Sequence, residues 1–122
     1  LNEIYNESIM VYMIDENNML VGVNAFVESI EEDVINQKFD ILIKETGVFK
    51  EEYDTTINTM TKLLDHSLEN DVLTLNLSKE FLESEGRTTL EQITWSFCGD
   101  DVKSINLMVD GEKINCLNGF YT

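Results

Sequence analysis

The sequence predicts an α+β fold, a single compact domain in which two main helices pack on one face of a mainly antiparallel sheet. Its 122 residues suffice for one hydrophobic core. Apolar and polar residues alternate in runs that are paired across short polar turns, and two other segments space their apolar residues as helices do. No repeat divides the chain, so residues 1–122 are expected to form one domain, with residues 1–7 as the candidate for disorder.

The first predicted elements are a β-hairpin and a helix. The β-rich runs 8–15 and 19–26 are separated by three polar residues, which is a hairpin loop length. Ser29 followed by Glu32 is a capping-box pattern, and apolar residues then recur at mostly helical spacing as far as Gly47. We therefore expect the first main helix to begin after Ser29 and to end near that glycine.

A second hairpin is predicted in the middle of the chain. Residues 48–58 have no sustained period and are expected to form an irregular connection. The runs 60–68 and 72–77 flank three polar residues and are expected to pair as strands. In the second run leucines alternate with polar residues, so one face of this strand should be buried.

A short helix is predicted to precede the second main helix. Ser78 is placed to cap the short helix, which should turn Phe81 and Leu82 inward. Thr88 followed by Glu91 is a second capping-box pattern, and the apolar residues after it have helical spacing. We therefore expect the second main helix to open at this pattern.

The last predicted elements are two strands joined by a tight turn. Residues 102–109 alternate between apolar and polar side chains, and residues 113–117 form a shorter strand. The turn between them holds Asp110 and Gly111, residue types that adopt the positive φ angles of a two-residue hairpin turn.

The charge of the chain is strongly negative. It has 24 acidic and 8 basic side chains, scattered along its length, and a formal net charge of −16. Nucleic acids and anionic lipids attract lysine and arginine, so we expect neither nucleic-acid binding nor direct binding to an anionic membrane. A basic protein partner and divalent cations are compatible with such a surface.

No catalytic or cofactor-binding pattern is found in the sequence. His66 is the only histidine, and its neighbours Asp65 and Ser67 would point to the other side of a strand, which disfavours a local catalytic triad. The six glycines are dispersed at predicted turns and helix ends rather than grouped in a phosphate-binding loop. We therefore expect a protein that is not an enzyme and holds no cofactor.

Acidic clusters are the candidate metal ligands. None has the ligand spacing of an EF-hand, so solvated acidic loops are favoured over weak calcium sites, and no metal site is predicted. The clusters are Glu31 with Glu32 and Asp33, Glu51 with Glu52, and Asp100 with Asp101.

Two cysteines and three aromatic residues are candidate functional positions. Cys98 and Cys116 could form a disulfide or remain as two thiols, and the sequence leaves both open. Trp95 lies off the apolar face of its predicted helix, where it either packs at the edge of the sheet or anchors a partner. Phe120 and Tyr121 are further candidates for partner contact.

An ordered series of residues in the second half of the chain carries a family resemblance. A strand ending in Leu-Ser-Lys leads through a helix to an alternating strand with its Asp-Gly turn, and then to a short strand ending near a glycine. The residues are Leu77, Ser78, Lys79, Phe81, Val102, Ile105, Leu107, Val109, Asp110, Gly111, Leu117 and Gly119. This series resembles the GerM domain of sporulation and spore germination proteins.

The resemblance implies a fold like the ring-building motif of oligomeric secretion-type assemblies and a non-catalytic role. It implies an extracytoplasmic protein, anchored to a membrane through a lipid or signal segment ahead of Leu1. Its partners would be other envelope or sporulation proteins, or copies of itself. The leading hypothesis is thus a protein-assembly module of a sporulation or cell-envelope complex. The alternative is an extracytoplasmic domain that binds a small ligand or a cell-wall fragment, and an accessory domain of a hydrolase is the least favoured.

Overall fold

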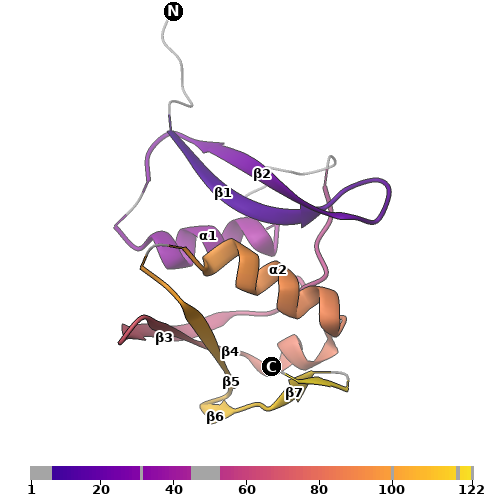
Figure 1. Cartoon of the computed structure of the whole chain (residues 1–122), viewed down its shortest axis with the longest axis vertical. Coiled ribbons are helices and arrows are strands. Elements are labelled where there is room, and N and C mark those ends of the chain that lie inside the picture. The colour runs from indigo at the N-terminus through magenta and orange to yellow at the C-terminus, as the bar shows by residue number, and fades with distance from the viewer. Residues whose placement is uncertain (1–6, 31, 45–52, 100, 118, 122) are drawn as a thin grey trace, which may run out of the picture.

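A β-hairpin, two α-helices and a four-stranded sheet form three successive layers, with the helices in the middle (Figure 1). The computed structural model describes residues 7–30, 32–44, 53–99, 101–117 and 119–121. In this part of the chain both helices pack on one face of the four-stranded sheet, and the hairpin covers their opposite side. The predicted α+β fold, with two main helices on one face of a sheet, is confirmed.

The N-terminal hairpin forms as its alternating sequence predicts. β1 (Glu7–Ile14) and β2 (Leu20–Val27) pair antiparallel in a register that is continuous from one end to the other. The loop is closed by the Asp15 side chain, whose Oδ1 accepts hydrogen bonds from two backbone N–H groups of the loop, both at 2.9 Å. Of residues 1–7, Glu7 belongs to β1 and the others lie outside the described residues.

The first helix, α1 (Val34–Leu42), begins later than predicted. Its N-cap is Asp33, whose Oδ1 accepts a hydrogen bond from the Asn36 N–H at 3.1 Å. The predicted capping box of Ser29 and Glu32 is therefore wrong. The chain needs the residues after β2 to reach the helix layer, and Asp33, at the end of that path, is an equally good cap.

The connection after α1 is irregular where it is described. Residues 53–62 hold no helix or strand apart from a bridge, in which Asp54 exchanges two backbone hydrogen bonds with the last residue of β1. The next strand consequently starts at Leu63, later than predicted. The predicted helix end near Gly47 is wrong, because α1 ends at Leu42 and Ile43 is its C-cap. Gly47 itself and the first part of the predicted loop 48–58 lie outside the described residues.

The four-stranded sheet has the order β3-β4-β5-β6. Its strands are β3 (Leu63–Glu69), β4 (Val72–Leu77), β5 (Ser104–Val109) and β6 (Glu112–Lys113). β3 with β4 and β5 with β6 pair antiparallel, whereas β4 and β5 are parallel because a helical crossover connects them. The pairing is mainly antiparallel, as predicted, and the parallel pair at the centre of the sheet makes the sheet mixed.

Alternate residues of β4 and β5 build the centre of the core. Leu73, Leu75 and Leu77 are fully buried, which confirms the prediction from their alternation. Leu107 and Val109 lie opposite two of them on β5 and are also buried. Burying one such side chain stabilises the fold by roughly 1.5–3 kcal/mol, so this face of the sheet holds the helices firmly.

Two-residue turns with positive φ angles close both antiparallel pairs of the sheet. Asn70 and Asp71 have φ angles of 51° and 66°. Asp110 and Gly111 have φ angles of 50° and 84°, which confirms the predicted Asp-Gly turn.

The predicted strand over residues 113–117 is divided in the structure. β6 ends at Lys113, and β7 (Cys116–Leu117) pairs antiparallel with β8 (Phe120–Tyr121) in a separate small hairpin. Gly119 has a φ angle of 88°, which glycine adopts without strain and which lets the chain reverse here.

A short 3-10 helix, η1 (Lys79–Glu83), follows β4. Phe81 is fully buried, as predicted, but Leu82 is exposed, so its predicted inward position is wrong. In a helix with three residues per turn, consecutive side chains point about 120° apart, so only one of the two can face the core.

The second helix, α2 (Arg87–Phe97), starts after Gly86 without a side-chain cap. The predicted capping box of Thr88 and Glu91 is therefore wrong, because Thr88 is already inside the helix. Ile93 is buried on the face that the spacing predicts. In the part of the chain described, no helix is long and apolar enough to cross a membrane.

Candidate functional site

Exposed apolar side chains gather on the outer face of the hairpin. β1 turns alternate residues inward to the helices, where they are buried, and therefore turns Met10 and Tyr12 outward. Met10 is 47% exposed, and Phe26 on β2 is 58% exposed. Trp95 of α2, which is 56% exposed, lies against Tyr12. We call this area the hairpin surface, defined by Met10, Tyr12, Phe26 and Trp95.

The Trp95 indole is held in place by Tyr12. The two rings meet edge to face, with centroids 5.3 Å apart and ring planes at 87°. Next to this contact, the Tyr12 N–H donates a hydrogen bond to the Ser96 Oγ at 3.0 Å, which fixes α2 beside β1. The sequence left Trp95 between packing and exposure, and the structure combines the two, since the ring contacts Tyr12 while more than half of the residue stays exposed.

Gly22 makes room for the Tyr12 ring. A Cβ atom at Gly22 would lie 3.0 Å from the Tyr12 Cε2 and 3.4 Å from the Met10 Sδ, so both side chains lie close over this glycine. Gly22 is also the residue directly opposite Tyr12 in the strand pair. The tyrosine ring is therefore confined between Gly22 and Trp95.

A half-buried lysine joins the two helices near this surface. The Lys38 Nζ donates a hydrogen bond to the Ser96 carbonyl oxygen at 2.7 Å and lies 5.5 Å from the centroid of the Phe97 ring. Burial lowers the pKa of Lys38. Because Ser96 binds β1 through its hydroxyl and α1 through its carbonyl oxygen, it fixes three elements relative to one another.

A buried polar network holds α2 against the irregular connection. Gln92 is fully buried, and its Oε1 accepts hydrogen bonds from the Thr56 N–H at 3.1 Å and from the Thr56 hydroxyl at 2.7 Å. Its Nε2 donates to the Thr55 Oγ1 at 3.0 Å, and the Thr89 hydroxyl donates to the Thr56 carbonyl oxygen at 3.1 Å. The network satisfies polar groups that the core would otherwise leave unpaired.

Reasoning from the sequence missed this network. Thr89, Gln92 and Ser96 are buried on α2 beside the predicted apolar positions Ile93 and Phe97. Their spacing of three and four residues is helical, and this polar stripe was the available signal. The sequence pattern alone does not indicate that this polar stripe is buried, because Thr56, the hydrogen-bond partner of Gln92, lies 36 residues away in the sequence.

The remaining predicted partner-contact residues lie elsewhere. Phe120 and Tyr121 form β8, which pairs with β7, and Figure 1 places β7 at the end of the molecule away from β1 and β2. Cys98 is half-buried at the C-cap of α2, Cys116 is exposed in β7, and both thiols are free. Of the three aromatic candidates, Trp95 is therefore the one that belongs to the hairpin surface.

His66 lies against Asp33 and links β3 to the start of α1. Its Nε2 is 3.1 Å from the Asp33 Oδ1 and 3.3 Å from the Oδ2. The pKa of Asp33 is lowered, first by the hydrogen bond from the Asn36 backbone N–H, then by the Asn36 side chain and by His66. This is the arrangement of a helix cap, because the N–H groups at the start of a helix stabilise a negative charge.

The acidic clusters are only partly described. Among the described residues, no three His, Cys, Asp or Glu side chains lie together as metal ligands would. Glu32 and Asp101 are exposed, as solvated residues are. The cluster members outside the described residues are Glu31, Glu51, Glu52 and Asp100.

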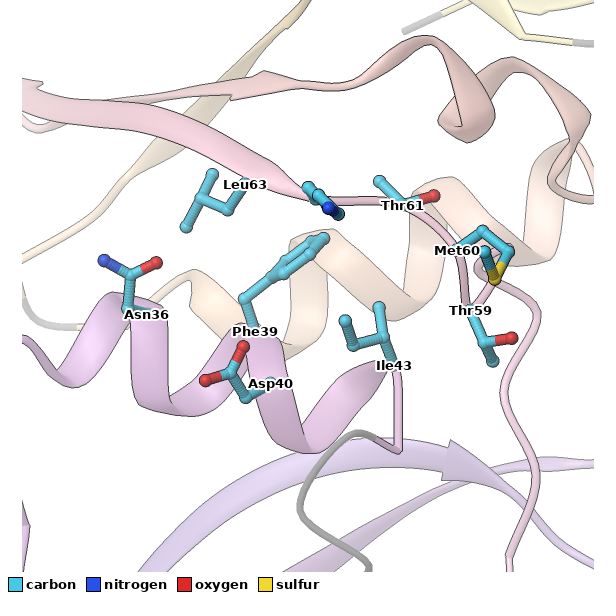
Figure 2. Close-up of a pocket in the computed structure, with 9 residues that line it drawn as sticks. Asn36, Phe39, Asp40, Ile43, Thr59, Met60, Thr61 and Leu63 are labelled. Carbon is cyan, nitrogen blue, oxygen red and sulfur yellow. The ribbon is translucent and has the colours of Figure 1, made fainter.

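A groove of about 560 Å³ opens between α1 and the residues that lead into β3 (Figure 2). The Phe39 ring points across it toward Thr61, whose hydroxyl is buried and has no hydrogen-bond partner in the described part of the chain. This volume is within the range of small-molecule sites. The lining residues are Asn36, Phe39, Asp40, Ile43, Thr59, Met60, Thr61, Lys62 and Leu63.

Two solved structures from Bacillus subtilis have the same fold. The first GerMN domain of the sporulation protein GerM matches with a TM-score of 0.81 and 14% identity, covering 96% of this chain and 92% of that chain. The tandem GerMN domains of GerM match with a TM-score of 0.82 and 14% identity, covering 95% of this chain. The match spans 43% of that longer chain, less than half of its length.

A candidate lipoprotein from Clostridium perfringens is a third structural match, with a TM-score of 0.59 and 24% identity over 98% of this chain and 85% of that chain. No curated protein sequence matches significantly. The sequence profile of the Germane family, described as sporulation and spore germination, matches residues 10–115, which is most of the chain. The chain therefore belongs to the Germane family of sporulation and spore germination, and its domain is GerM-like, as its sequence predicted.

Proposed function

We propose that this chain is a non-catalytic, extracytoplasmic module that assembles with other proteins of a sporulation or cell-envelope complex. Membership of a sporulation and germination family supports a role in sporulation. The fold shared with a candidate lipoprotein supports a place at the envelope, with a membrane anchor carried elsewhere in the parent protein.

The observation that carries the assembly role is the hairpin surface. Trp95 and Tyr12 belong to the residue types that dominate binding energy at protein interfaces, and their two rings contact each other. Large apolar residues that are exposed next to one another mark interaction sites, above all where polar residues surround them. Glu7 at the start of β1 and Glu28 directly after β2 provide such an acidic border.

The same border predicts the charge of the partner. With a net charge of −16, the chain would approach a basic protein surface faster than an acidic one. An apolar contact on the hairpin surface, framed by salt-sensitive contacts to basic residues, is the expected form of the interface.

The proposal is tested by photo-crosslinking in the native cells, with a crosslinking amino acid in place of Trp95 in the full-length protein. The matched control position is Leu68, which is 49% exposed but lies on β3 in the four-stranded sheet. Position 95 should give crosslinks to one or a few sporulation or envelope proteins, and position 68 should give none of them. The same crosslinks from both positions, or none from position 95, would overturn the assembly role.

The groove of Figure 2 favours a second candidate function, binding of a small ligand or a cell-wall fragment. Its lining combines the apolar Phe39 ring with the charged residues Asp40 and Lys62, a combination that suits a ligand with both apolar and charged groups. A muropeptide titrated into the protein should then shift the amide resonances of these residues saturably. The shifts should weaken in Lys62→Gln, and their absence would remove this candidate.

A further inference from the structure

We propose that the outer edge of β2 is a docking edge for an extended segment of a partner protein, one with lysine or arginine at its ends. The segment would pair with β2 and extend the hairpin by one strand. This inference rests on the proposed assembly function and specifies the contact through which it would act.

The hydrogen bonds that β1 makes outside the hairpin show which way the backbone N–H and C=O groups of its residues point. The Tyr12 N–H donates to the Ser96 Oγ, and Ile14 exchanges two backbone hydrogen bonds of 2.8 Å with Asp54. Both residues therefore turn their backbone groups away from β2. In an antiparallel strand pair, two residues directly opposite each other behave alike. Either they exchange backbone hydrogen bonds with each other, or the N–H and C=O groups of both point away from the partner strand.

The outer edge of β2 follows from this rule. Leu20 lies opposite Ile14 and Gly22 lies opposite Tyr12, so their N–H and C=O groups point outward, away from β1. By the two-residue period of a strand, Asn24 and Phe26 do the same. Among the described residues no strand pairs with this edge, since the hairpin is a separate two-stranded sheet.

The edge of β2 lacks the features that usually protect an edge strand. β2 has no charged residue and no proline, and its register with β1 has no bulge. β3, an edge strand of the other sheet, has Asp65, His66 and Glu69 and a register shift near its start. The edge of β2 therefore has fewer protective features than the edge of β3.

Charge decides which strand fits this edge. Asp15 and Glu16 precede β2 and Glu28 follows it, so both ends of the edge are acidic while its length is neutral. A segment with an uncharged centre and basic ends is complementary to this pattern. A second copy of the chain would bring another net charge of −16 and the same acidic ends, which disfavours self-pairing.

An added strand would also meet side chains of the hairpin surface. Phe26, on the edge strand itself, would gain a neighbour on the outer face of the extended sheet. Cross-strand contacts with aromatic side chains stabilise such pairs, and β-branched residues suit these positions. A partner strand bound to the docking edge would thus also contact the hairpin surface.

The test uses the purified 122-residue chain and a synthetic peptide, Lys-Lys-Thr-Val-Thr-Val-Thr-Val-Lys-Lys, blocked at both ends. Amide NMR shifts should saturate, with the largest changes at Gly22, Asn24 and Phe26. N-methylation of alternate peptide amides along one edge should weaken binding about tenfold when it blocks the pairing edge, because the ladder loses its donors. A peptide with glutamate in place of lysine should bind about tenfold more weakly or not at all.

Two variants at Asn24 and a control on β3 distinguish strand pairing at the β2 edge from nonspecific electrostatic attraction. Asn24→Pro removes an outward N–H, which an edge strand tolerates, so the hairpin should persist and the peptide should no longer bind. An unchanged near-ultraviolet circular dichroism signal from Tyr12 and Trp95 verifies that the hairpin is intact. Asn24→Lys should weaken binding as well, whereas Ser67→Lys, which places the same charge on β3, should leave it nearly unchanged.

Each of the following results would overturn the inference. The first is the absence of shifts at the β2 edge up to about 1 mM peptide, the weak limit of a specific contact. The second is equal binding of the lysine and glutamate peptides. The third is a dimer seen by light scattering and abolished by Asn24→Pro, which would make a second copy the occupant. If Trp95 crosslinks in cells persist unchanged in Asn24→Pro, the docking edge fails while the assembly function stands.

Discussion

Replacing Gln92 by leucine should destabilise the domain strongly, although the two side chains are similar in size. The substitution removes the acceptor of two hydrogen bonds from Thr56, one from its backbone N–H and one from its hydroxyl. Thr56 is itself buried, so water cannot replace the lost acceptor. The Thr55 hydroxyl also loses the donor that Gln92 supplies.

The magnitude follows from the number of orphaned groups. Each buried donor left without a partner costs about 1–3 kcal/mol, and the leucine recovers part of this because no amide has to be buried. We therefore expect a net loss of about 2–4 kcal/mol, a large part of the 5–15 kcal/mol that is typical of a domain. The melting temperature should fall by about 6–20 °C.

The assay is urea unfolding followed by circular dichroism and by the fluorescence of Trp95, the only tryptophan. Thr94→Leu is the control, because Thr94 is exposed on the same helix and its replacement should change stability by less than about 0.5 kcal/mol. In the double variant with Thr56→Val the loss should be about 1 kcal/mol smaller than the sum of the single losses, since the hydroxyl that Gln92→Leu leaves unpaired is then absent. A Gln92→Leu protein as stable as the wild type would refute the reasoning.

Three further predictions concern a helix cap and two glycines. The pKa of Asp33 is lowered in the folded chain, so the stability that its carboxylate contributes is present above the unfolded pKa of 3.8 and is lost as the pH falls below that value. In melting temperatures measured across a pH series, Asp33→Ala should therefore show a smaller decrease at acid pH than the wild type. The same decrease in both proteins would contradict the role of Asp33 as a cap. Gly22→Ala should alter the near-ultraviolet circular dichroism because its Cβ would displace the Tyr12 ring, whereas at Gly99 nothing lies within 4 Å of an added Cβ, so Gly99→Ala should leave the signal unchanged. Gly111→Ala should cost about 1 kcal/mol in urea unfolding because of the positive φ angle, and a variant as stable as Gly99→Ala would argue against that turn.

The strands were predicted best where alternation is regular. The two strands of the N-terminal hairpin and the buried leucines of β4 lie where the sequence places them, because a period of two leaves one face for the core. The Asp-Gly turn was predictable for a similar local reason, since few residues adopt its positive φ angles.

The helix starts were not predictable from local patterns. Ser29 and Asp33 are both good caps within a few residues of each other, and the choice depends on where β2 ends in space. At α2 neither residue of the capping-box pattern is used, because the chain enters the helix directly from Gly86. Local pattern therefore located the helices and tertiary structure set their ends.

The candidate site could be predicted only in part. Trp95 was recognised as a position off the apolar face of its helix, but its contact with Tyr12 joins residues far apart in the sequence. The outward edge of β2 depends on hydrogen bonds from β1 to Ser96 and Asp54, which no periodicity reveals. Such contacts follow from the packing of layers and not from the sequence of either layer alone.

The affinity of the full-length protein for the partner found by crosslinking tests the central claim most directly. It should be measured for the wild type, for Trp95→Ala and for Leu68→Ala, the last as the control at a comparably exposed site. If the hairpin surface binds the partner, Trp95→Ala should bind at least about tenfold more weakly, and Leu68→Ala should bind as the wild type does. Loss of the ring contact with Tyr12 should lower the melting temperature of Trp95→Ala by only about 2–7 °C, so the protein stays folded at the assay temperature. Equal affinities for the wild type and Trp95→Ala would contradict the central claim.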